Sequence, residues 1–144
     1  MKRPAACRSL AGDRGASAVE LAILAPALIL ASLLIIQFAL WFDARHAALA
    51  AAQQGDLVAR EDAGVNAAAW VDLAEQAATS YYRGLDTGVL SGFQADAFPG
   101  TAQDTVSVTV SGNMTGVWPL TVTETVTGPI ECFRTEASQG AACG

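Results

Sequence analysis

Apolar residues dominate the chain from Gly15 to Phe42, where the only charged side chain is Glu20. An α-helix rises about 1.5 Å per residue, so this run makes a helix of about 40 Å, whereas roughly 20 apolar residues already cross the hydrocarbon core of a bilayer. A globular core of this size needs no such uninterrupted apolar run. The pattern therefore predicts one membrane-spanning helix over residues 16–42.

Beyond residue 42 the chain becomes rich in alanine and other strong helix formers, without proline up to residue 62. This composition predicts that the helix continues outside the membrane, with Trp41 and Phe42 in an interfacial aromatic belt and Asp43 and Arg45 just beyond it. Gly55 weakens the predicted helix and is expected to mark a bend.

A second helix is predicted over Val65–Tyr82, where apolar residues recur at helical spacing. Arg83 and Gly84 supply a basic last turn and a glycine end signal. The apolar stripe of this helix, expected to pack on the first helix or on a sheet, consists of Trp70, Leu73, Ala74, Ala77 and Tyr81.

Alternation with a period of two appears near the C-terminus. Val106–Val110 alternates with Ser and Thr, and a second alternating stretch runs from Leu120 to Val126, with SGNMTG as the turn. The pattern predicts a β-hairpin with one apolar face on the helices. The glycine-rich stretch Gly84–Asp104 is interpreted as an irregular connection. The predicted fold class is therefore α+β, with a long N-terminal transmembrane helix, a second helix and a C-terminal β-hairpin.

Charge is distributed unevenly about the apolar run. Residues 1–15 carry four basic side chains and one acidic one, whereas residues 43–144 carry twelve acidic and four basic ones. Basic residues beside a membrane helix stay on the cytoplasmic side, which predicts a cytoplasmic leader and an extracytoplasmic domain in a single-pass protein of the cell membrane. The acidic domain argues against nucleic acid as a partner, because phosphate binding needs clustered Lys and Arg.

The three cysteines divide in the same way. Cys7 lies in the predicted cytoplasmic leader, where thiols stay reduced. Cys132 and Cys143 lie in the outer domain, and a disulfide between them would close a loop of roughly a dozen residues and contribute about 3 kcal/mol in the chain-entropy model. The polar segment between them permits this pairing, which we expect; two free thiols are the alternative.

The start of the apolar run carries a specific arrangement, in which Gly15 ends the basic leader and Glu20 follows five residues later. A carboxylate inside a bilayer is costly and usually marks a function, although Glu20 at headgroup depth would simply stay solvated. Pro26 removes one backbone hydrogen bond and is either a local kink or a tolerated membrane proline.

This segment resembles the N-terminal signature of the TadE-like pseudopilins of the tight-adherence (Tad/Flp) pilus system, over about residues 13–42. The family often has an aromatic residue after the glutamate, where this chain has Leu21. The ending VTGPIECFR, residues 126–134, resembles the family's ending more weakly. The residues that carry the resemblance are Arg14-Gly15, Ala18-Val19-Glu20, Leu21-Ala22 and Pro26.

The resemblance implies a pilin-like fold and a role as a structural or assembly component of a Tad-type pilus or related secretion apparatus. It further implies cleavage after Gly15 by a prepilin peptidase, which leaves Ala16 as the new N-terminus and Glu20 as the fifth mature residue. Glu20 is then expected to pair with the amine of a neighbouring subunit during assembly. The implied partners are the membrane, other pilin or pseudopilin subunits and the prepilin peptidase.

The sequence offers no catalytic constellation, no metal or cofactor motif and no sign of a small-molecule substrate. His46 is the only histidine and is expected to be a solvated surface residue. Three other interpretations stay open: an uncleaved single-pass envelope protein whose outer domain binds a partner or the cell wall, a secreted protein with a signal peptide ending near the ALAAA after Arg45, and, more weakly, a small envelope enzyme.

Overall fold

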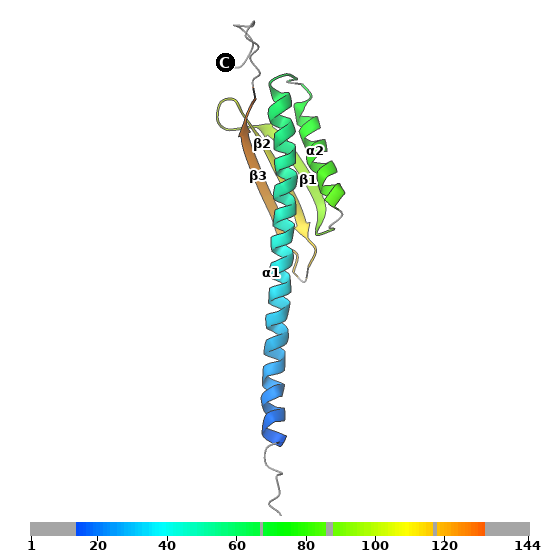
Figure 1. Cartoon of the computed structure of the whole chain (residues 1–144), viewed down its shortest axis with the longest axis vertical. Helices are drawn as coiled ribbons and strands as arrows, with labels where there is room; N and C mark the ends of the chain where they lie inside the picture. The colour runs from blue at the N-terminus through cyan, green and yellow to red at the C-terminus, as the bar shows by residue number, and fades with distance from the viewer. Residues whose placement is uncertain (1–13, 67, 86–87, 117, 132–144) are drawn as a thin grey trace, which may run out of the picture. The chain divides into compact units, whose positions relative to one another are not determined.

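The computed structural model describes residues 14–66, 68–85, 88–116 and 118–131 (Figure 1). The chain divides into two compact units, Met1–Ile36 and Gln37–Gly144, which we call the N-terminal and the C-terminal unit. The α+β fold class is confirmed. The elements in chain order are the helices α1 (Arg14–Ala63) and α2 (Trp70–Leu85) and the strands β1 (Leu90–Pro99), β2 (Thr105–Met114) and β3 (Thr121–Pro129).

The N-terminal unit contains the first part of α1, whose apolar side chains are exposed. Leu21, Ile29 and Ile35, for example, are all more than 60% accessible. The helix from Ala18 is long and apolar enough to cross a membrane, and none of its apolar window is buried inside the protein. Ser32 donates its hydroxyl to the carbonyl of Leu28 at 2.8 Å, so this polar group is satisfied within the helix, as a hydrocarbon environment requires.

The C-terminal unit is built on an antiparallel sheet with the strand order β1-β2-β3. Figure 1 shows α2 and the C-terminal part of α1 on one face of this sheet. The predicted hairpin is confirmed as β2 and β3, in which Val108 pairs with Val126 and Thr109 with Thr125. The predicted turn SGNMTG is wrong in its first four residues, which extend β2 to Met114. The valines of β2 point to the helices, and Val106, Val108 and Val110 are fully buried.

Strand β1 was not expected, because the stretch Gly84–Asp104 is interpreted from the sequence as an irregular connection. This interpretation is wrong for Leu90–Pro99. The register between β1 and β2 shifts between Ser91 and Gln94, and Gly92 at this bulge has a φ of +62°. A bulge interrupts the period of two that identifies a strand in the sequence. The two ends of the strand nevertheless pack inward, since Leu90 and Ala97 are both buried.

The C-terminal part of α1 packs through alanines, which confirms that the helix continues beyond residue 42. The buried alanines lie at helical spacing on one face: Ala44, Ala47, Ala48, Ala51, Ala52 and Ala59. Small side chains let the backbone of α1 approach its neighbours closely. A Cβ atom at Gly55 would lie only 3.0 Å from both the Ala74 carbonyl oxygen and the Val108 side chain. The helix runs through Gly55, whose role is close packing.

Helix α2 begins at Trp70, later than the predicted Val65, and ends at Leu85. Trp70 and Ala74 are buried as expected, but the rest of the buried stripe is Ala78 and Tyr82. The prediction of Ala77 and Tyr81 is therefore wrong by one residue, and Leu73, also predicted to face inward, is exposed. Ala77 and Tyr81 each belong to a pair of identical neighbours, so the sequence pattern favours neither member.

The contacts of Tyr82 show why this tyrosine is the buried one. Its hydroxyl donates to the Leu90 carbonyl at 2.9 Å and accepts from the Leu90 N–H at 2.8 Å. Its ring stacks on Phe93, with 4.2 Å between the ring centroids. Tyr82 thus ties the end of α2 to the start of β1.

Candidate processing and assembly segment

Helix α1 begins at Arg14, so Gly15 and Ala16 lie in its first turn. The first N–H groups of a helix have no partner within the helix, and opening this turn therefore breaks fewer hydrogen bonds than opening an interior turn. The Gly15–Ala16 bond therefore lies in a turn of α1 that costs few hydrogen bonds to open.

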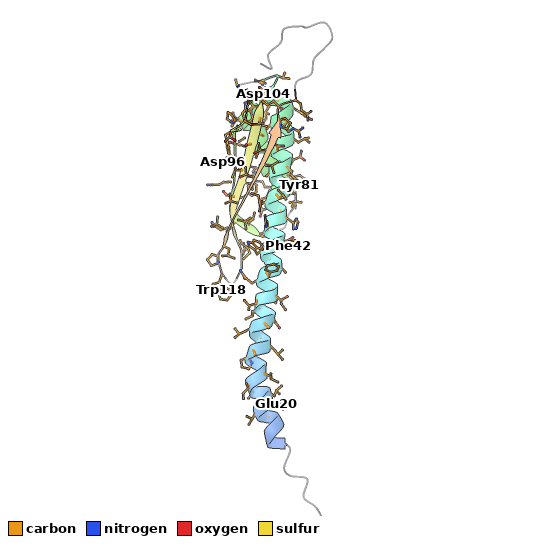
Figure 2. All side chains as sticks on the ribbon, turned by 90° about the vertical axis from the view of Figure 1, so that its left-hand side faces the viewer. Glu20, Phe42, Tyr81, Asp96, Asp104 and Trp118 are labelled. Carbon is orange, nitrogen blue, oxygen red and sulfur yellow. The ribbon has the colours of Figure 1, made fainter. Side chains whose placement is uncertain are left out.

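Glu20 lies one turn after Ala16 and is exposed (Figure 2). A spacing of four residues places positions 16 and 20 on the same helix face, about 6 Å apart along the axis. Helical side chains also lean toward the N-terminus, so the Glu20 carboxylate is directed toward the level of residue 16. An amine created at Ala16 would thus lie on the face that carries the carboxylate.

Pro26 lies inside α1, on the exposed apolar stretch. It has no N–H, so the carbonyl of Ala22 loses its usual helical partner. The helix continues on both sides of it. This position is a local weakness in the hydrogen bonding of the apolar segment.

The remaining candidate functional groups are metal ligands, the histidine and the cysteines. In the described part of the chain, no group of three or more His, Cys, Asp or Glu side chains lies close enough to hold a metal ion. His46 is exposed, and its ring lies edge-on to Phe42 at 4.3 Å. Cys7, Cys132 and Cys143 lie outside the described residues, so the disulfide stays a prediction.

A charged cluster that the sequence does not reveal joins the end of β3 to α1. Arg60 donates to the Pro129 carbonyl at 3.0 Å and forms an ion pair with Glu131 at 2.7 Å. Gly128 makes room for the side chains of both Arg60 and Asp56. A Cβ there would lie 2.5 Å from Arg60 Cδ and 2.7 Å from a carboxylate oxygen of Asp56. This close approach accounts physically for the glycine in the VTGP sequence.

Asp56 in this cluster is only 6% exposed. Its Oδ1 atom has no hydrogen-bond partner among the described residues. Burial raises the pKa of Asp56 above its ordinary value, because it disfavours the charged form, and the nearby Arg60 guanidinium opposes this rise.

The segment that carries Gly15, Glu20 and the first buried alanines can be compared with known families. Residues 15–55 match the family of TadE-like proteins. The suspected resemblance is therefore confirmed for this segment. No curated protein and no solved structure gives a significant match. The TadE-like segment extends beyond the predicted membrane span and ends at Gly55, so it also includes the alanine face from Ala44 to Ala52.

The match to TadE-like proteins suggests a membrane-anchored component related to the Tad pilus. The long apolar helix agrees with single-pass anchoring. Within the TadE-like segment, the structure adds two physical features to the motif: the exposed carboxylate of Glu20 in the apolar stretch of the helix, and a small-residue face that packs the same helix into a folded domain.

Proposed function

We propose that the protein is a TadE-like minor pseudopilin, a membrane-anchored assembly component of a Tad-type pilus or related secretion apparatus. Its leader lies in the cytoplasm, and its α+β domain lies outside the cell membrane. A prepilin peptidase cleaves after Gly15, and Glu20 directs assembly with other pilin or pseudopilin subunits. The observation that carries the proposal is the exposed Glu20 on the apolar helix of the TadE-like segment.

The energetic basis is the cost of a lone carboxylate in a bilayer. Insertion scales place a charged side chain at about 2.5–3.5 kcal/mol at the helix centre. Glu20 lies near the start of the span, where this cost is smaller, and pairing lowers it further. Cleavage after Gly15 supplies the partner, because it creates a charged amine at Ala16. Since Glu20 lies one turn from Ala16, a neighbour whose amine meets this carboxylate is offset along the axis by about one turn, roughly 5 Å. The ion pair between the Glu20 carboxylate and a neighbour's Ala16 amine therefore stabilises one axial register among helices that are otherwise uniformly apolar.

The first test is the N-terminal residue of the membrane-extracted protein, from intact mass and terminal sequencing. The proposal expects a chain that begins at Ala16. Gly15→Leu should abolish this processing, whereas Ala22→Leu, a similar gain in size further along the helix, should leave it intact. A chain that keeps Met1 would favour the uncleaved envelope anchor, and a start beyond Ala44 would indicate an ordinary signal peptide.

The second test separates assembly from anchoring. Glu20→Gln and Glu20→Leu should insert in the membrane at normal levels and fail to crosslink to partner subunits in cells that carry the apparatus. Ser32→Ala, a change at another exposed polar residue of the same helix, should behave like the wild type. Normal crosslinking of Glu20→Leu would refute the assembly role, because the anchor interpretation predicts that this change is neutral or improves membrane retention.

A further inference from the structure

The end of the C-terminal unit at which residue 37 lies carries exposed apolar side chains from two elements. Two come from α1, Phe38 and Phe42, which are 65% and 51% exposed. Two come from the connection between β2 and β3, Trp118 and Leu120, which are 56% and 44% exposed. We call these four residues the apolar belt. Large apolar side chains exposed at one end of a domain are candidates for an interaction site.

The connection between β2 and β3 is held firmly against α1. The side-chain amide of Gln37 donates to the Trp118 carbonyl at 3.1 Å, and Gln37 is only 7% exposed. A Cβ at Gly116 would lie 2.9 Å from the Gln37 Oε1 atom, so the glycine permits this contact. Met114 donates its N–H to the Leu120 carbonyl at 2.7 Å and closes the connection. Trp118 therefore has a defined level along α1, beside residue 37.

The belt is continuous in sequence with the apolar run of the membrane helix. Gln37 directly follows Ile36, and the chain has no charged residue between Glu20 and Asp43 or between residues 105 and 123. Figure 2 shows Trp118 nearer than Phe42 to the residue-37 end of the C-terminal unit. A charged rim, which would keep this end of the domain in water, begins only at Asp43 and Arg45.

We propose that the apolar belt lies in the lipid interface of the bilayer, with Trp118 at headgroup depth, so that the residue-37 end of the C-terminal unit contacts the membrane surface. The hydrocarbon span is then residues 16–36, about 30 Å of helix, which equals the thickness of a typical hydrocarbon core. A span that reached Phe42 would be about 40 Å long and would take Trp118 below the interface. Trp is enriched at this depth because it has an apolar body and a polar N–H group.

The occupant of the belt is lipid, because the belt continues the membrane helix and Trp118 is fixed at the level where that helix leaves the hydrocarbon. This inference requires only that α1 spans a bilayer. It is independent of cleavage at Gly15 and of any partner subunit, so its test can fail while the proposed pseudopilin function holds.

The test uses the fluorescence of Trp118 in the full-length protein, reconstituted in vesicles of phosphatidylcholine and phosphatidylglycerol. The chain has three tryptophans, and the double variant Trp41→Phe/Trp70→Phe leaves Trp118 as the reporter. The control adds Trp118→Phe and Phe98→Trp. Phe98 is 41% exposed and pairs with Ser107, near the opposite end of β2 from Met114, about 20 Å away at the usual strand rise.

Lipid brominated on the upper acyl chain should quench Trp118 at least about twofold more than the control tryptophan, as an interfacial side chain requires. Acrylamide in the water should quench the control more than Trp118. If the circular dichroism spectrum shows that the double variant is unfolded, the quenching of Trp118 is obtained instead from the difference between the wild type and Trp118→Phe. Equal quenching of both sites by brominated lipid would overturn the proposal, and so would protection of Trp118 from both quenchers, which indicates a protein cover.

Discussion

Replacing Gly55 with alanine tests the close approach of α1 to the elements beneath it. The added Cβ would lie 3.0 Å from the Ala74 carbonyl oxygen, 3.0 Å from Val108 Cγ1 and 3.1 Å from the Ala78 Cβ. Ordinary contacts of a Cβ atom begin near 3.4 Å. The first contact is with the backbone of α2, and Val108 is fully buried, so neither neighbour can move without disturbing the core.

Two opposing terms set the change in the free energy of unfolding caused by Gly55→Ala. Alanine gains about 1 kcal/mol of helix propensity over glycine, whereas overpacking a tight core typically costs about 1–3 kcal/mol. Because two of the neighbours are constrained, we expect the cost to lie in the upper part of this range. The Gly55→Ala protein should therefore be about 1 kcal/mol less stable than the wild type.

Gly84 provides a matched control in α2. A Cβ at Gly84 meets nothing within 4 Å, so Gly84→Ala should keep the propensity term alone and stabilise the domain by about 0.5–1 kcal/mol. The two variants should differ by nearly 2 kcal/mol, which for a domain of this size is a difference in Tm of roughly 10 °C. The assay is thermal unfolding of the full-length protein in detergent micelles, followed by near-ultraviolet circular dichroism. A Gly55→Ala protein that melts at or above the wild-type Tm would refute the close packing.

Two further substitutions test buried polar groups. Tyr82→Phe removes the hydroxyl that bonds both backbone groups of Leu90 and should cost about 2–3 kcal/mol in the same melting assay; Tyr81→Phe, at an exposed site, should be neutral. Asp56→Asn should raise stability at neutral pH by about 1 kcal/mol. Burial raises the folded-state pKa of Asp56, although Arg60 opposes this rise. The contribution of the neutral Asp56 carboxyl to stability is therefore fully present below the unfolded pKa and is lost as pH rises through the folded pKa. The Asn variant should lack this loss, and equal pH profiles for both proteins would contradict the assignment.

The sequence predicts the helices and the hairpin because their patterns are local. The alanine-rich composition after residue 42 already favours helix, and the alternating valines of β2 already favour a strand. Strand β1 escapes prediction because the bulge at Gly92 breaks its alternation, and only pairing with β2 reveals it. The buried member of the Tyr81–Tyr82 pair is likewise decided by a partner elsewhere, the backbone of Leu90.

In the candidate site, too, features carried by neighbouring residues are predictable and features that depend on distant contacts are not. Gly15 and Glu20 are recognisable from the sequence because a motif of neighbouring residues carries them. The contact of Gln37 with Trp118 joins residues 81 positions apart, and no local pattern contains it. The approach of Asp56 to Gly128 similarly depends on the packing of β3 against α1.

The fastening of β3 to Arg60 has a practical consequence for labelling. Glu131 donates its N–H to the Arg60 carbonyl at 3.0 Å and pairs with the Arg60 side chain, so the last described residue lies beside this helical turn. Gln37 lies about 35 Å away along the same helix. A fluorescent label placed at this last described residue would therefore lie at the end of the C-terminal unit opposite the apolar belt, where it can report on topology without competing for the lipid surface.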